Sequence, residues 1–154
     1  MNLFFPLFYL LLILIFLSII LKLVIQQIFL ILKLKKQIKI IRSRINLNNA
    51  STKIYLSLGK IYLTKQSYKN ALEIFQKCLK LWDKNDKLGL SHLYTLIGFI
   101  YSKINLFEFA QFYLEEAIFN TKTSKTNLNN LKYIYQRRRL TKKYIETTFY
   151  INSL

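Results

Sequence analysis

The chain has 154 residues and a formal net charge of +17, with 24 lysines and arginines against seven acidic residues. That length is enough for one small domain and an anchoring segment. A single cysteine excludes an internal disulfide. The presence of only three glycines disfavours a glycine-rich nucleotide cradle, and a single histidine disfavours a histidine-based metal cluster. No sequence motif for catalysis is present, so we expect neither an enzyme nor a cofactor.

An uncharged apolar run, residues 3–21, opens the chain. As a helix it would be about 28 Å long, close to the ~30 Å hydrocarbon core of a bilayer. A cleaved signal peptide would need a basic start and a small-residue cleavage site, but no basic residue precedes Lys22 and no alanine precedes Ala50. We therefore expect residues 1–32 to form a retained membrane anchor. Its span would end near Lys22 and continue as an amphipathic juxtamembrane helix.

A basic linker or helix is expected over residues 33–51. All seven acidic residues lie at Glu73 or later, whereas basic residues directly follow the apolar run. This asymmetry predicts that the C-terminal part faces the cytoplasm-equivalent side and that the basic segment binds anionic lipid. The predicted membrane-surface residues are Lys33, Lys35, Lys36, Lys39, Arg42 and Arg44.

A pattern of large, small and aromatic residues occurs in residues 52–85 and again in residues 86–124, where Asp86 to Leu90 form a five-residue insertion. The insertion is expected to lengthen the first helix of the second copy by more than a turn, with Gly89 as a weak point. Small residues would sit where helix axes approach, pairing Gly59 with Ala71 and Gly98 with Ala110. The matching residues are Tyr55, Leu58, Gly59, Tyr62, Ala71, Phe75 and Cys78 in the first copy and Tyr94, Ile97, Gly98, Tyr101, Ala110, Leu114 and Ala117 in the second.

This spacing resembles the tetratricopeptide repeat, a helix–turn–helix unit of about 34 residues. The resemblance implies an all-α protein in which an N-terminal transmembrane helix precedes a short solenoid with a C-terminal capping helix. Residues 125–154 fit either that capping helix or a degenerate third repeat, in which Lys132 replaces the small residue.

Tetratricopeptide domains bind partners in a concave groove lined by their first helices. The resemblance places ten residues of this chain there: Lys53, Leu56, Lys60, Leu63, His92, Thr95, Phe99, Lys103, Asn129 and Tyr133. The clamp that binds chaperone tails would fall at Leu56, Lys60, Leu96, Thr126 and Asn130, and it is mostly absent. A groove that mixes basic and apolar residues suits a short helix or extended segment with some negative charge.

The layout of one span, a basic segment and about three repeats is similar to a tetratricopeptide family of cyanobacteria and red-lineage plastids associated with photosystem I assembly or stability. The chain is rich in isoleucine, lysine, asparagine, phenylalanine and tyrosine and poor in glycine, alanine and proline, as AT-rich coding produces. This bias and the lack of a transit peptide are consistent with a plastid gene. The resemblance implies a single-pass thylakoid protein with its domain in the stroma, acting as a scaffold for photosystem I subunits or assembly factors.

Two rival hypotheses stay open. The first is a membrane-bound receptor for protein import or translocation in a bacterium or mitochondrion. The second is a basic RNA-associated factor. The run Arg137–Arg138–Arg139 could contact a phosphate backbone or an acidic protein tail. No nucleic-acid motif accompanies that run, so the solvated face of a helix is an equally good interpretation and nucleic acid is an improbable partner.

Overall fold

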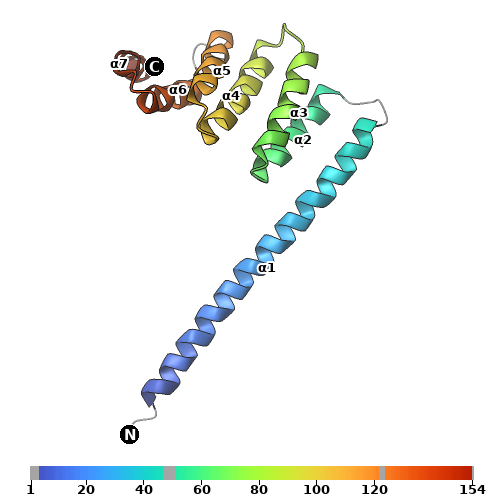
Figure 1. Cartoon of the computed structure of the whole chain (residues 1–154), viewed down its shortest axis with the longest axis vertical. Coiled ribbons are helices and arrows are strands. Elements are labelled where there is room, and N and C mark those ends of the chain that lie inside the picture. Colours follow the sequence, from blue (N-terminus) through green and yellow to red (C-terminus); the bar gives the residue numbers. More distant parts are fainter. Residues whose placement is uncertain (1–3, 47–50, 122–123, 154) are drawn as a thin grey trace. The chain divides into compact units, whose positions relative to one another are not determined.

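The protein is described by a computed structural model that covers residues 4–46, 51–121 and 124–153. Within those residues the regular structure is entirely helical, which confirms the all-α prediction. The chain divides into two compact units, residues 1–44 and 45–154 (Figure 1). Residues 47–50 of the expected linker, 122–123 at the end of the second repeat, and the terminal residues 1–3 and 154 lie outside the described part.

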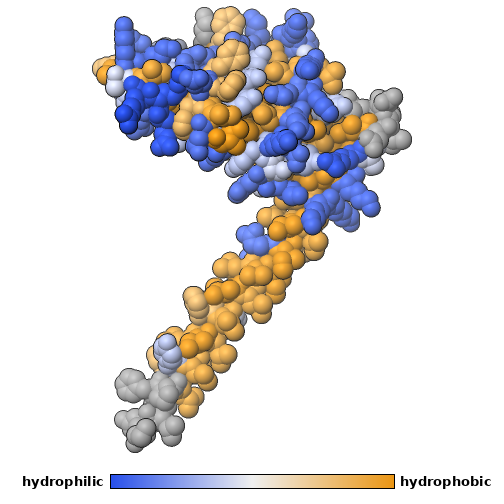
Figure 2. All heavy atoms as spheres, in the orientation of Figure 1, coloured by the Kyte–Doolittle hydropathy of each residue, from blue (hydrophilic) through white to orange (hydrophobic). Residues whose placement is uncertain are grey.

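The first unit is built on α1, an unbroken helix from Phe4 to Asn46. It is long and apolar enough to cross a membrane, and Figure 2 shows hydrophobic residues along most of its length. A helix of 43 residues would extend about 65 Å, twice the thickness of a hydrocarbon core. The segment predicted as a juxtamembrane helix after Lys22 is continuous with the apolar span, because the helix does not break there. The sequence explains this, because neither glycine nor proline occurs between Leu7 and Asn46.

Six shorter helices form the second unit. They pack as consecutive antiparallel pairs, and each pair packs on the next, as α3 does on α4 and α5 on α6 (Figure 1). The helices are α2 (Thr52–Thr64), α3 (Tyr68–Leu81), α4 (Lys87–Lys103), α5 (Phe107–Asn120), α6 (Lys125–Arg137) and α7 (Thr141–Ser153).

The same tight turn joins the two helices of every pair. Gln66, Asn105 and Arg139 have positive φ values of 56°, 62° and 58°. The next residue in each turn donates its N–H to a tyrosine carbonyl at 2.9 Å, namely that of Tyr62, Tyr101 or Tyr135. Two helices with this turn are what a third repeat requires, so α6 and α7 match the third-repeat alternative. Their residues follow those of the second repeat at an offset of 34, whereas the first two repeats are offset by 39.

The repeat residues of the first two pairs form the core. Most are buried, while Tyr55, Tyr94 and Tyr101 are half-buried. At Gly98 a Cβ would lie 3.3 Å from the Ala110 carbonyl oxygen and closer still to Leu114, so these two helices approach as expected. At Gly59 the three atoms nearest to an added Cβ all belong to the ring of Phe75, so the expected partner Ala71 is not the nearest contact.

The insertion has a defined structure. The helix α4 has 17 residues where α2 has 13, so it is longer by slightly more than one turn. Asp86 caps it by accepting the Gly89 N–H at 2.9 Å, and the indole N–H of Trp82 donates to Asp86 at 3.2 Å. A Cβ at Gly89 would lie 2.4 Å from the Trp82 ring. Glycine at this position thus leaves room for the Trp82 ring and the Asp86 carboxylate beside the helix backbone, and its role as a weak point stays a prediction.

The third pair is packed by different chemistry. The positions of Gly98 and Ala110 are taken by Lys132 and Tyr144. The ammonium group of Lys132 lies 5.2 Å from the centre of the Tyr144 ring, a cation–π contact. Two large side chains thus stack where two small ones let the helices approach.

Candidate protein-binding groove and its surroundings

The ten predicted groove residues lie on α2, α4 and α6, the first helices of the three pairs. Seven of them are exposed, and Leu56, Leu63 and Thr95 are half-buried. Lys103 on α4 places its ammonium 5.2 Å from the centre of the Phe99 ring. Partial burial and the nearby positive charge of Lys60 lower the pKa of His92, so its imidazole is neutral at pH 7. The positive charge on this surface therefore comes from lysines.

Thr95 differs from the other predicted groove residues because its hydroxyl is already engaged. It lies 2.8 Å from the Ser91 carbonyl oxygen and 2.8 Å from Asn127 Oδ1 on α6. Ser91 is buried with its hydroxyl 2.8 Å from the Ala117 carbonyl oxygen, and the Asn127 amide donates to Ser91 at 3.3 Å. These polar groups satisfy one another's hydrogen-bonding capacity and join α4 to α6. The hydroxyl of Thr95 therefore has a structural role between helices. Ser91 and Asn127 were not among the residues predicted from the sequence.

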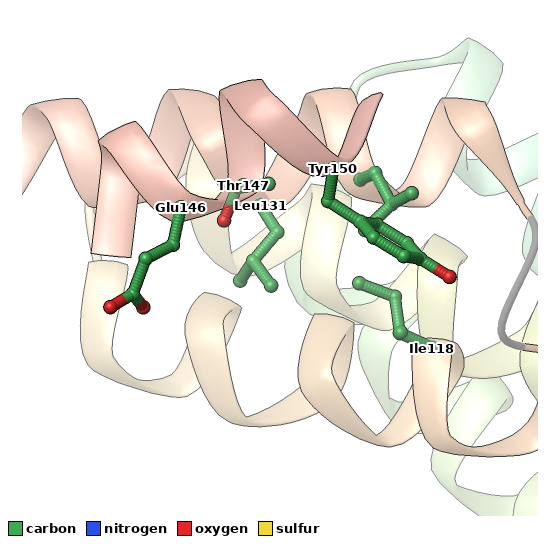
Figure 3. A pocket seen from close by; sticks show the side chains of 6 residues that line it. Ile118, Leu131, Glu146, Thr147 and Tyr150 are labelled. Atoms are coloured by element: carbon green, nitrogen blue, oxygen red, sulfur yellow. The ribbon is translucent and has the colours of Figure 1, made fainter. Parts of the chain in front are cut away.

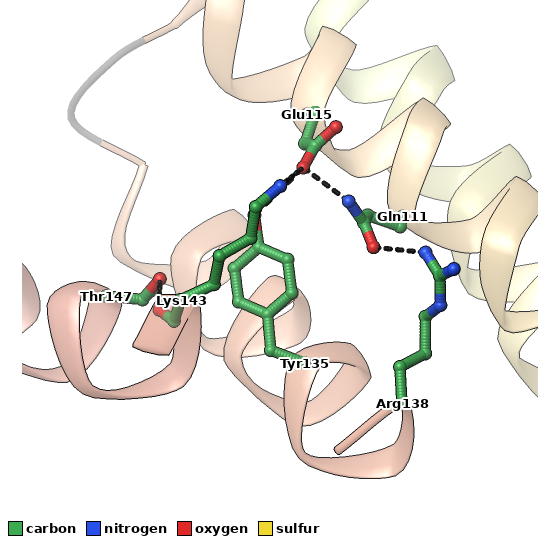
Figure 4. Close-up of polar contacts among 6 residues, drawn as sticks. All are labelled: Gln111, Glu115, Tyr135, Arg138, Lys143 and Thr147. Atoms are coloured by element: carbon green, nitrogen blue, oxygen red, sulfur yellow. Dashed lines mark hydrogen bonds and ion pairs between the residues drawn. The ribbon is translucent and has the colours of Figure 1, made fainter. Parts of the chain in front are cut away.

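A second polar network joins α5 to the third repeat (Figure 4). Glu115 accepts hydrogen bonds from Gln111 at 2.7 Å, the Tyr135 hydroxyl at 2.9 Å and Lys143 at 3.4 Å. Burial and the carboxylate of Glu115 raise the pKa of Tyr135 far above its usual range, so the phenol stays protonated. The network is a connection between repeats and offers no acid and base poised for proton transfer.

The arginine run is partly occupied by contacts within the fold. Arg137 lies over the Phe107 ring at 5.4 Å, and Arg138 donates to Glu108 at 3.0 Å and to Gln111. Arg139 holds the left-handed position of the turn. Two of the three guanidinium groups therefore have partners on α5, and the run does not form a three-arginine surface for a phosphate backbone.

An aromatic stripe on α5 was not predicted. Phe109, Phe112 and Phe119 are 54%, 56% and 78% exposed. Phe109 stacks on Tyr101 at 5.2 Å, and Phe112 meets Tyr113 edge-on at the same distance. The equivalent positions carry only polar or charged residues in the other repeats, namely Asn70, Glu73 and Lys80 in the first and Lys143, Glu146 and Ser153 in the third. Comparing the copies position by position would have revealed this difference.

A shallow pocket of about 330 Å³ lies between α5, α6 and α7 (Figure 3). Its lining is mostly apolar, with one carboxylate, and consists of Ile118, Leu128, Leu131, Glu146, Thr147 and Tyr150. Across the described residues no three histidine, cysteine or acidic side chains cluster as metal ligands. Cys78 is fully buried and donates to the Thr52 carbonyl oxygen at 3.3 Å, and burial raises the pKa of its thiol to about 11. Such a thiol is a core residue and a poor nucleophile.

Comparison with known proteins identifies the family to which this chain belongs. Residues 51–118 match the family model of the tetratricopeptide repeat. A ycf37 protein of Pyropia yezoensis is 30% identical over 142 residues, which cover 90% of this chain and 80% of that protein. The chain belongs to the ycf37 family. The ycf37 protein of Guillardia theta is 36% identical over 97 residues, which cover 63% of this chain but only 54% of the relative, so the match spans about half of that protein's length.

Solved structures agree with the fold of this ycf37 protein. MamA superposes with a TM-score of 0.69 at 20% identity, covering 78% of this chain and 67% of that one. YrrB, described as a TPR protein with an unusual peptide-binding site, superposes with a TM-score of 0.68 at 15% identity, covering 80% and 61%. The chain is thus a tetratricopeptide scaffold for protein binding, with one N-terminal helix suited to a membrane anchor.

Proposed function

We propose that this ycf37 protein is a membrane-tethered scaffold that binds a photosystem I subunit or assembly intermediate in the groove of α2, α4 and α6. The observation that carries the proposal is a repeat stack whose first helices expose lysines beside apolar side chains. Lys53, Lys60 and Lys103 are exposed, and Phe99 and Leu56 lie among them. The family resemblance supplies the link to photosystem I.

The groove chemistry selects the kind of segment that binds. Ammonium groups favour carboxylates, and the half-buried leucines and Phe99 favour aliphatic or aromatic anchors. Because His92 is neutral at pH 7, the attraction for acid depends on the lysines and weakens as salt screens them. We expect a short helix or extended segment with at least one acidic residue near an apolar one.

The anchor raises the local concentration of such a segment. A weak groove tethered beside membrane-bound partners experiences effective concentrations up to about the millimolar range. The basic residues that follow the apolar run favour the stromal side for the repeats, since cytoplasm-equivalent loops are enriched in lysine and arginine. The same residues are placed to bind anionic headgroups, at about 1 kcal/mol each. The proposal therefore places α1 in the thylakoid membrane and the repeats in the stroma.

A pull-down tests it. The full chain with a C-terminal tag would be purified from its native membranes in mild detergent, and every co-purifying protein identified. Photosystem I subunits or intermediates are expected, and they should be lost when Lys53 and Lys60 are both replaced by glutamate. Translocase components in their place would favour the import-receptor hypothesis, and ribosomal RNA would favour the RNA-associated one.

A further inference from the structure

The last helix, α7, carries a face that the earlier repeats use for stacking. In each preceding repeat the second helix packs against the first helix of the next one, α3 against α4 and α5 against α6. On α5 the side chains that make this contact include the buried Ala110 and Leu114 and, around them, Gln111, Glu115 and Ile118. Gln111 bonds Arg138, Glu115 accepts from the Tyr135 hydroxyl, and Ile118 joins the core around Leu131.

Two of the three equivalent residues of α7 are apolar, and all three are exposed. The offset of 34 residues maps Gln111 to Ile145, Glu115 to Phe149 and Ile118 to Asn152. Ile145 is 51% exposed and Phe149 is 72% exposed. A terminal repeat stays soluble by presenting a polar outer face. Here the stacking face of the final helix instead has two large apolar side chains one helical turn apart, where the internal repeat has two polar ones.

The first helix of the third repeat extends the same surface. Thr95 on α4 lies within hydrogen-bonding distance of Asn127 on α6, so this position faces the next repeat. Its equivalent on α6 is Asn129, which is exposed. We call Asn129, Ile145 and Phe149 together the end face.

We propose that the end face docks an amphipathic α-helix of a partner protein, packed against α7 in the way that α6 packs against α5. The internal repeats show what covers this face: a helix with apolar residues three, four and seven positions apart, as in Leu128, Leu131, Ile134 and Tyr135 of α6. The docked helix would place apolar anchors on Ile145 and Phe149. It would also place a hydrogen-bonding side chain opposite Asn129, as Asn127 lies opposite Thr95.

A second copy of this chain is a poorer occupant. Complete burial of one aromatic side chain covers about 150–250 Å², so the partly exposed Phe149 and Ile145 together offer a few hundred Å². A stable dimer interface buries about 800 Å² on each partner. A two-fold contact would also bring the exposed Lys142 and Arg139 of two copies together. A partner helix with acidic flanks avoids that repulsion.

Site-specific photocrosslinking tests the proposal. The full chain in lipid nanodiscs, with benzoyl-phenylalanine at position 149, would be irradiated with solubilised plastid membranes of Pyropia yezoensis and the adducts mapped by mass spectrometry. The matched control carries the same group at Phe119, which is 78% exposed on the outer face of α5. We expect position 149, and not position 119, to crosslink to a segment with helical spacing of apolar residues in another protein.

A synthetic peptide of the mapped segment then measures dependence on the face. Phe149→Lys should weaken its binding to the full chain at least tenfold, and Phe119→Lys should leave it unchanged. Because Phe149 is largely exposed, Phe149→Lys should not change the melting curve. Adducts only to lipid, to a second copy, or equally from both positions would overturn the proposal, as would peptide binding insensitive to Phe149→Lys. The double variant Lys53→Glu/Lys60→Glu, which tests the groove, should leave both the crosslinking at position 149 and the binding of the peptide unchanged, so the two proposals can fail separately.

Discussion

The contact between Gly59 and Phe75 allows the repeat packing to be tested quantitatively. A Cβ added at Gly59 would lie 2.2 Å from Cε1 of the Phe75 ring, whereas carbon atoms pack at about 3.5–4.0 Å. Phe75 is fully buried, so the ring has to move by more than about 1 Å inside a closed core. Overpacking of this kind costs about 1–3 kcal/mol, and alanine regains about 1 kcal/mol of helix propensity. Gly59→Ala should therefore destabilise the repeats by about 1 kcal/mol, and Gly59→Leu by more.

Trp82 is the only tryptophan and lies within the repeats, so its fluorescence reports their thermal unfolding in the full chain in detergent. A loss of about 1 kcal/mol should lower Tm by roughly 4 °C. Ser57→Ala, at an exposed position of the same helix, is the matched control and should shift Tm little. Phe75→Leu removes the ring atoms that clash, so Gly59→Ala should cost less in that background by about 1 kcal/mol. Strict additivity of the two changes, or a higher Tm for Gly59→Ala, would refute the close approach of α2 and α3.

Three further outcomes are expected. The buried Cys78 thiol, with a pKa of about 11, should react with a disulfide reagent at pH 8 roughly a hundredfold more slowly in the native chain than in urea, and equal rates would contradict its burial. Because this pKa is raised, its contribution to stability is complete below about pH 9 and is lost as pH rises through about 11, so Cys78→Ala should reduce the fall in Tm over that range. Charge reversal at Lys53 and Lys60 should weaken capture of the groove partner at least tenfold without lowering Tm, whereas reversal at Lys77 and Lys80 on α3 should not; equal effects would place the binding site elsewhere. Replacing Lys33, Lys35, Lys36 and Lys39 by glutamate should weaken or invert the membrane topology, and protease protection identical to that of the unaltered chain would contradict the charge argument.

The first two repeats and the apolar helix could be predicted because each rests on a strong local rule. Glycine is costly inside a helix, so Gly59 and Gly98 at one shared position indicate close packing rather than chance. An uncharged run of 19 residues indicates a helix that can enter a bilayer. Both features depend on residue type and spacing alone.

The third repeat was left ambiguous because its packing uses different residues. Lys132 and Tyr144 stand at the two small positions, and no rule of spacing predicts that a lysine and a tyrosine will stack there. Its turn also places an arginine in the left-handed conformation, which sequence alone does not indicate. Arg137 and Arg138, which directly precede Arg139, contact Phe107 and Glu108 on α5. Neither a solvated helix face nor a phosphate-binding run included these internal contacts, which only the tertiary structure reveals.

Equivalent surface positions of the three repeats carry different residues. The repeats share one pattern of core residues, which packing requires. Surface positions do not have to follow that pattern, so a difference between equivalent surface positions reflects what each repeat contacts. The groove helices vary between lysine, phenylalanine and tyrosine at one such position, at Lys60, Phe99 and Tyr133. At a second such position the stacking helices vary from the polar Glu115 on α5 to the apolar Phe149 on α7. Glu115 is half-buried, whereas Phe149 is 72% exposed. A core-forming rule cannot explain an exposed phenylalanine at the end of the stack, whereas a helix that continues the stack in a partner explains both its chemistry and its position.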